Sequence, residues 1–229
     1  MKNSLLKGAI TISVGGLVAK ILGAFYRIPL TNILGAEGIG LYQMCFPIYC
    51  ILLTFSSTGV PNSLAKLISQ GADEKIVLKK SLKIFSVFGL VGMILMLSLG
   101  RIIAKTQGNE QAYLCYIMLS PSVLLTSLLS CFRGYFQGKN NMKPTAISQI
   151  IEQVVKLAFG LTVAFIFRKN VVLSAGLCAL AVTLSELVAF LFVYKLYKKG
   201  EHFLKGKEIA GKGIILTVIP VTLSALLIP

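Results

Sequence analysis

The chain of 229 residues is strongly apolar and also basic. Hydrophobic residues make up 55% of it and charged residues only 14%, with a mean hydropathy of +0.82. Soluble domains have about 25% charged residues, so this composition excludes an ordinary soluble domain. The net charge of +15 does not indicate nucleic-acid binding, because the basic residues punctuate long apolar runs instead of gathering on a soluble face.

Apolar segments follow one another along the whole chain, and each is long enough to cross a bilayer, which takes roughly 20 residues. Six segments can be marked off: Leu5 to Leu34, Ile39 to Ile68, Leu82 to Ile103, Ala112 to Phe132, Thr145 to Phe167 and Val171 to Tyr194. Spans of this length must be helices, because lipid offers no partner to free backbone groups. The sequence therefore predicts an all-α, polytopic membrane helical bundle.

Residues 1–212 are expected to form a six-helix transmembrane lobe, and residues 213–229 to start a seventh transmembrane helix. This last apolar segment begins at Gly213 and has only 17 residues, with no polar flank at its far end. We therefore expect the chain to be a fragment of a longer transporter.

Lysine and arginine residues are distributed unevenly between the connections that join the predicted spans. Most of the 23 precede the first span or follow the second, fourth and sixth spans. The opposite connections carry only Arg101, Lys105, Arg168 and Lys169. Cytoplasmic loops carry the excess of positive charge, so we expect a multi-pass protein of the cytoplasmic membrane with its amino terminus inside.

Neither a metal centre nor an enzyme active site can be assembled from these residue types. The five cysteines all lie in apolar stretches without CxxC spacing, and the one histidine, His202, lies in a basic loop. The cysteines are interpreted as small buried hydrophobic residues. No nucleophile, base and orienting group converge, so we expect no enzyme activity, no metal and no cofactor.

Charged residues inside the predicted spans are the most informative ones. A charge at the bilayer centre costs about 2.5 to 3.5 kcal/mol on insertion scales, so it usually faces a wet cavity. Six charged residues lie within or at the ends of spans: Lys20, Arg27, Lys66, Lys156, Glu152 and Glu186. Four positive and two negative charges predict a cationic interior, which suits a substrate with phosphate groups.

These charges belong to polar stripes with helical spacing on four of the predicted spans. We expect the stripes to face a shared transport cavity. Its candidate residues are Lys20, Arg27, Gln43, Gln149, Glu152, Gln153, Lys156 and Glu186. Pro47 and Pro61 would interrupt the second span and permit bending, although a static kink is equally consistent with the sequence.

Structural roles are the alternative for several of these residues. Glu152 and Lys156 are four residues apart in the favourable order and could simply neutralise each other. Lys66 and Arg27 could extend to the membrane surfaces. Glu186 could bind a proton or a cation, or could be a structural hydrogen-bonded acid.

Four sequence blocks resemble a known group of transporters. They are KILGAFYRIPL at 20–30, ILGAEGIGLYQM at 33–44, FRGYFQG at 132–138 and MKPTAISQIIEQ at 142–153. Together they resemble the stage V sporulation protein B group of the multidrug/oligosaccharidyl-lipid/polysaccharide (MOP) exporter superfamily, which includes the MATE exporters.

This resemblance implies two pseudo-symmetric lobes around a central cavity, of which the chain would supply the N-terminal lobe of a flippase. It implies a flippase that moves an undecaprenyl-diphosphate-linked saccharide, such as a cell-wall or spore-cortex precursor, by alternating access. Lys20 stands where related lipid-precursor flippases carry a cation, whereas Arg27 is offset by one residue from the nearest family arginine. A proton or Na⁺ could be the coupling ion, and a homodimer could replace the second lobe.

Two other functions are compatible with the pattern. A cation-coupled multidrug exporter of the same superfamily would need acids and aromatic residues for its cationic drugs, against the predicted positive interior. A non-transporting membrane scaffold for envelope synthesis is the third possibility, because one lobe alone cannot form a two-lobed cavity.

Overall fold

The computed structural model describes residues 2–54, 57, 59–200, 206–207 and 211–227. Within them the chain is helical apart from short connections. The helices are α1 (Lys2–Met44), α2 (Phe46–Leu53), α3 (Val60–Ser69), α4 (Glu74–Thr106), α5 (Tyr113–Gly138), α6 (Lys143–Ile166), α7 (Val171–Lys199) and α8 (Gly211–Leu227). A short 3₁₀ turn, Glu110–Ala112, leads into α5. The predicted all-α bundle is confirmed.

Five helical segments of the described part are long and apolar enough to cross a membrane. They are Ile10–Leu53, Glu74–Thr106, Glu110–Gly138, Lys143–Ile166 and Val171–Lys199. The shorter α8 corresponds to the predicted seventh segment. The division into a lobe at 1–212 and a further segment at 213–229 stays a prediction.

The predicted second span, residues 39–68, is not one continuous helix. Its first residues extend α1, which bends at Gly35, where a φ of 67° interrupts the helix just beyond the predicted end of the first span. The remainder divides into α2 and α3. Pro47 and Pro61 each lie in the first turn of one of these helices, where proline sacrifices no hydrogen bond.

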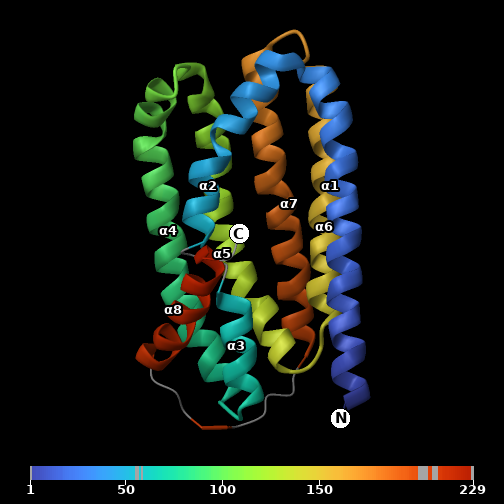
Figure 1. Ribbon diagram of the computed structural model, residues 1–229, viewed down its shortest axis with the longest axis vertical. Helices are drawn as coiled ribbons and strands as arrows, with labels where there is room; N and C mark the ends of the chain where they lie inside the picture. Colours follow the sequence, from blue (N-terminus) through green and yellow to red (C-terminus); the bar gives the residue numbers. More distant parts are fainter. Residues whose placement is uncertain (1, 55–56, 58, 201–205, 208–210, 228–229) are drawn as a thin grey trace.

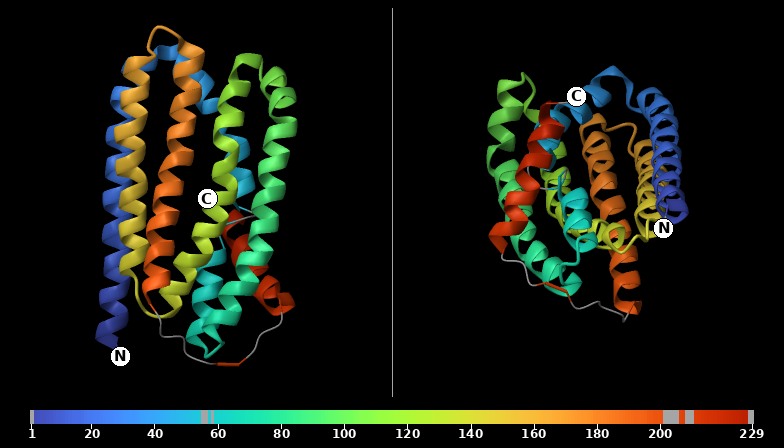
Figure 2. Two further views of the ribbon diagram at one scale, coloured as in Figure 1. Left: turned by 180° about the vertical axis from the view of Figure 1, so that it is seen from behind. Right: turned by 60° about the horizontal axis from the view of Figure 1, so that its bottom comes forward.

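The long helices stand side by side, with α7 central (Figures 1 and 2). It packs against α5 and α6, while α6 also packs against α1 and α5 against α4. The first turns of α1, the α3–α4 and α5–α6 connections, the end of α7 and the start of α8 all lie at one end of the bundle (Figure 1). Described lysines such as Lys75, Lys79, Lys139 and Lys199 are therefore gathered at one end of the bundle. Which side of the membrane this end faces stays a prediction.

Two apolar cores stabilise the bundle. One joins the upper parts of α1, α5, α6 and α7 with α2, and the other joins α3, the lower parts of α4, α5 and α7, and α8. Many large apolar side chains instead point outward and are exposed, including Phe25, Ile28, Val87, Ile94, Phe165 and Leu216. Such an apolar outer surface suits lipid, which needs no polar covering.

Candidate functional site

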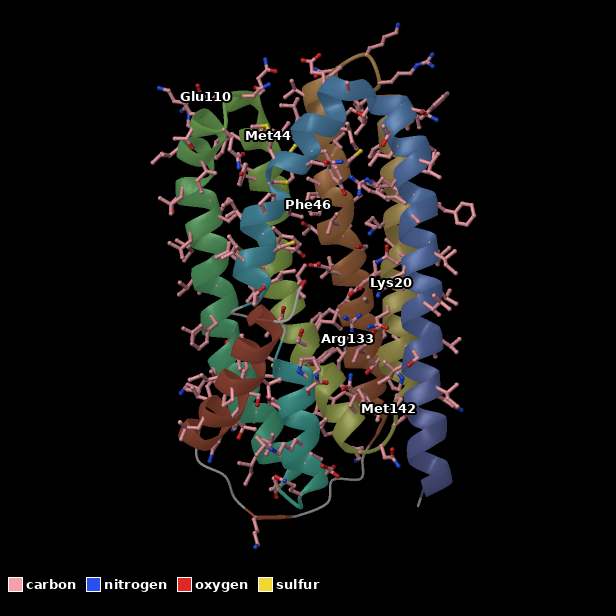
Figure 3. The ribbon with its side chains drawn as sticks, viewed as in Figure 1. Lys20, Met44, Phe46, Glu110, Arg133 and Met142 are labelled. Atoms are coloured by element: carbon pink, nitrogen blue, oxygen red, sulfur yellow. The ribbon has the colours of Figure 1, made fainter. Side chains whose placement is uncertain are left out.

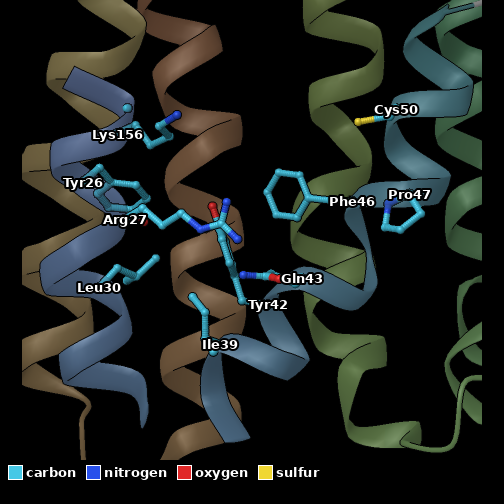
Figure 4. A pocket seen from close by; sticks show the side chains of 11 residues that line it. Tyr26, Arg27, Leu30, Ile39, Tyr42, Gln43, Phe46, Pro47, Cys50 and Lys156 are labelled. Atoms are coloured by element: carbon cyan, nitrogen blue, oxygen red, sulfur yellow. The ribbon is translucent and has the colours of Figure 1, made fainter. Parts of the chain in front are cut away.

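A cavity of about 580 Å³ opens between α1, α2 and α6. Its lining consists of Gly23, Tyr26, Arg27, Leu30, Ile39, Tyr42, Gln43, Phe46, Pro47, Cys50 and Lys156 (Figure 4). The bend at Gly35 and the break before Phe46 turn the chain from α1 into α2. Residues of both helices can therefore face the same space. Four predicted site residues meet here: Arg27, Gln43, Pro47 and Lys156.

The charged residues in this lining are all positive. Arg27 is exposed and Lys156 is partly buried. The Lys156 ammonium lies 5.6 Å from the centre of the Tyr26 ring, an arrangement that stabilises a cation at the face of an aromatic ring. Neither aspartate nor glutamate belongs to the lining, so the cavity favours anionic groups.

Tyr26 packs closely against the backbone at Gly160. A side chain at Gly160 would place its Cβ 2.5 Å from the Tyr26 hydroxyl oxygen and 2.9 Å from Cε2 of the ring. The Tyr26 hydroxyl is buried and makes no hydrogen bond to the described residues. Sequence reasoning missed this residue, although it lies beside Arg27 and three residues from Gly23.

Gln149 and Gln153 lie on α6, at its interface with α1. A Cβ built at Gly23 would lie 3.3 Å from Oε1 of Gln153, and one built at Gly16 would lie 3.9 Å from Oε1 of Gln149. Both glutamine oxygens are buried without a hydrogen-bond partner among the described residues. The two glutamines face α1 as expected, but neither belongs to the lining of the cavity.

Glu152 forms an ion pair that the sequence did not suggest. Nη2 of Arg133 donates to Oε1 of Glu152 over 2.8 Å, and Nε of Arg133 donates to the Ser148 hydroxyl over 2.9 Å. The two charged side chains are only 12% and 17% exposed. Glu152 therefore pairs across helices with Arg133, and no ion pair between Glu152 and Lys156 occurs among the described residues.

The placement of Arg133 in a loop after the fourth span is also corrected. Helix α5 continues to Gly138, six residues beyond the predicted end at Phe132. Arg133 consequently lies in the lower half of α5 (Figure 3) and its side chain reaches α6. The guanidinium pairs with a carboxylate that would otherwise be buried alone, which explains why the apolar helix continues through a charged residue.

Glu186 is the other acid within the spans, and it is 7% exposed. The hydroxyl of Tyr49 donates to its Oε1 over 2.5 Å, which links α7 to α2. Nearby on α7, the hydroxyl of Thr183 donates to the carbonyl oxygen of Met118 over 2.7 Å. Glu186 lies outside the lining of the cavity. Its partner Tyr49 was not predicted, because their separation of 137 residues leaves no local signal.

Lys20 is exposed near the middle of α1 (Figure 3). It does not line the cavity, but it is one helical turn from Gly23 and two turns from Arg27, both of which do. Lys66 is exposed near the end of α3, and Pro61 lies in the first turn of that helix. The His, Cys, Asp and Glu side chains of the described residues form no group of three that could hold a metal ion.

Solved structures with this fold are transporters. The chain superposes with a TM-score of 0.80 and 18% identity on an outward-facing MATE multidrug resistance transporter of the MOP superfamily, covering 98% of this chain and 53% of that one. A MOP superfamily transporter from Pyrococcus furiosus, whose structure is described by a reversed polarity of its binding pocket, gives a TM-score of 0.75 and 17% identity over 96% and 52% of the two chains. The fold is that of one part of a MOP-type membrane transporter.

Residues 5–229 match the model of the polysaccharide biosynthesis protein family, and the chain belongs to that family. It is 32% identical to stage V sporulation protein B of Bacillus subtilis, covering 89% of this chain and 42% of the relative. It is 26% identical to the lipid II flippase MurJ of the same organism, covering 87% and 41%. The chain thus spans less than half the length of these relatives. Both the resemblance to the sporulation protein group and the membrane assignment are confirmed.

Proposed function

We propose that the protein is a flippase that moves a lipid-linked saccharide across the bacterial cytoplasmic membrane by alternating access, and that its cavity binds the diphosphate of this lipid. The observation that carries the proposal is the lining itself. Arg27 and Lys156 converge on one space with no acid among their neighbours in the lining. Such a site attracts phosphate and repels cationic molecules.

Electrostatic arithmetic supports a diphosphate as the ligand. Two opposite unit charges 4 Å apart attract by about 4 kcal/mol at an effective dielectric constant of about 20. A diphosphate presents several anionic oxygens, so both cations can be engaged at once. Gln43 can add an amide donor from the same lining, which would compensate in part for the hydrogen bonds to water that the phosphates lose.

The apolar outer surface accounts for the rest of such a ligand. The lipid tail of a polyprenyl carrier can stay in the bilayer against the exposed side chains of the bundle, while its polar head enters the cavity. The family supports this assignment, since the similar MurJ protein is a lipid II flippase. An undecaprenyl-linked cell-wall or spore-cortex saccharide is the substrate that we propose.

A multidrug exporter is the second candidate, because the solved MATE structure belongs to a multidrug resistance transporter. Its substrates would be cationic drugs, and Arg27 and Lys156 would repel them. A scaffold without transport activity would need no cavity of this charge. The three functions can be separated by one set of reconstitution assays.

The test uses the full-length protein in liposomes with a fluorescent undecaprenyl-diphosphate saccharide. We expect binding and translocation in the unaltered protein, and about ten-fold weaker binding in Arg27→Gln and in Lys156→Gln, since each loses a charged hydrogen bond to phosphate. Lys66→Gln is the matched control, because Lys66 is exposed on α3 outside the lining. It should bind as tightly as the unaltered protein.

Three outcomes would contradict the proposal. Transport of a cationic dye without transport of the lipid would favour the multidrug exporter. Binding that is unchanged in the Arg27→Gln, Lys156→Gln double variant would show that the cavity does not hold the diphosphate. A folded protein that translocates neither probe would favour the scaffold.

A further inference from the structure

Glu186 carries a carboxyl oxygen that the fold buries without a partner. The Tyr49 hydroxyl satisfies Oε1 over 2.5 Å, but Oε2 is buried with no hydrogen-bond partner among the described residues. The buried carboxyl group therefore has one oxygen, Oε2, that can take up a proton.

The cations around Glu186 do not neutralise it. The charged groups that act on it are Arg133 of α5 together with Glu152 and Lys156 of α6. Arg133 forms its ion pair with Glu152. The Lys156 ammonium lies over the Tyr26 ring. No ion pair to Glu186 occurs within the described part of the chain. An unpaired carboxylate at this depth is costly, and binding of a proton removes the charge.

The helix that Tyr49 links to Glu186 is short. Helix α2 has eight residues and begins after a turn at Cys45. It also carries Phe46 and Pro47 of the cavity lining. A change in the bond between Tyr49 and Glu186 would therefore act on a wall of the cavity.

We propose that Glu186 is a proton-binding site whose occupancy sets how firmly α2 is held to α7. A proton from water binds Oε2, and the charge of the side chain changes from −1 to zero. The reverse step returns the proton to water. Hydrogen bonds to an ionised acceptor are roughly twice as strong as those to a neutral one, so the bond from Tyr49 is strong in the ionised state and weaker in the protonated state.

This inference rests on the proposed function only in that α2 forms part of the cavity wall. Its test therefore uses no lipid substrate, and a failure of translocation would leave it intact. The first measurement is the infrared C=O stretch of protonated carboxylic acids in the reconstituted protein, over a series from about pH 4 to about pH 9 that covers exposed and buried glutamates. We expect a titrating band that disappears in Glu186→Gln and persists in Glu37→Gln, in which an exposed acid is removed.

The second measurement is backbone hydrogen exchange in α2. Glutamine mimics the neutral acid, so at the acid end of the series the unaltered protein and Glu186→Gln should exchange at the same rate. At the alkaline end α2 of the unaltered protein should exchange about five-fold more slowly, the factor that corresponds to about 1 kcal/mol of extra hydrogen-bond strength. Comparison at equal pH cancels the intrinsic pH dependence of exchange.

Tyr49→Phe distinguishes proton binding at Glu186 from the attachment of α2 to α7. It also provides a test if Glu186→Gln fails to fold. It should keep a titrating carboxyl band, yet exchange in α2 should be faster than in the unaltered protein at alkaline pH. The proposal is overturned if no titrating band depends on Glu186. It is equally overturned if exchange in α2 is the same in the unaltered protein and in Tyr49→Phe at every pH.

Discussion

The ion pair between Arg133 and Glu152 should be a main stabilising contact between α5 and α6. The groups are 2.8 Å apart and their side chains are 12% and 17% exposed, so water screens them only in part. Breaking a buried pair by removing one partner costs about 3 to 5 kcal/mol, because the other charge is left without compensation. Ser148 would still accept one hydrogen bond from Arg133, and some water can enter. We therefore expect Glu152→Leu to lower the free energy of unfolding by about 2 to 4 kcal/mol.

A double-mutant cycle separates the pair from the packing around it. Arg133→Met, Glu152→Leu and the double variant would be unfolded reversibly in mixed micelles, with loss of helical circular dichroism as the signal. The double variant should be closer in stability to the unaltered protein than either single variant, because it leaves no charge alone.

The matched control is the pair between Arg101 and Glu110, which is 2.5 Å apart with side chains 70% and 47% exposed. Exposed ion pairs contribute little, because water and salt screen them. The same cycle at this pair should show no measurable coupling. If the Arg133 and Glu152 variants were additive as well, the inter-helix ion pair would not exist in the membrane protein.

Two further predictions concern packing and capping. In Gly134→Ala the new Cβ would lie 2.9 Å from Cα and from the carbonyl oxygen of Pro61, so we expect a loss of about 1 to 3 kcal/mol in the unfolding assay. Gly40→Ala is its control, since nothing lies within 4 Å there, and equal effects of both would refute the close approach of α5 to α3. Asn170→Ala removes the side-chain oxygen that accepts from the Leu173 backbone N–H over 3.0 Å, and α7 should lose about 1 kcal/mol. Unchanged stability and unchanged hydrogen exchange in the first turn of α7 would contradict this capping role.

The sequence predicts the membrane bundle well because its signal is local. The length of each apolar run, and the need of backbone groups in lipid for hydrogen-bond partners, locate the apolar part of each long helix. The helices extend beyond it, as for the sixth predicted span, 171–194, against α7 at Val171–Lys199. The second span was mistaken as one helix because its apolar residues are nearly continuous. The chain direction there depends on Gly35 and on the two prolines, whose effect on a turn is not visible in hydropathy.

The candidate site was predicted in part, and the reason differs from residue to residue. Arg27 and Lys156 were identified because a charge inside an apolar run is conspicuous. Arg133 was missed since a charge near a span end resembles a loop residue, and only the packing of α5 on α6 brings it to Glu152. Tyr26 and Tyr49 were missed because a tyrosine in a membrane helix is unremarkable until its hydroxyl partner or its cation is known.

Lys20 is a candidate cation that lies outside the cavity lining. It is exposed in this structure, yet a lysine midway along a spanning helix cannot face lipid without a cost of about 2.5 to 3.5 kcal/mol. Gly23 and Arg27 both line the cavity. Their spacings from Lys20 keep all three residues on one side of α1. This side of the helix must therefore meet water, polar protein surface or a charged ligand. In the proposed flippase, Lys20 is then the next cation that a diphosphate would encounter after leaving Arg27, along the same face of the same helix.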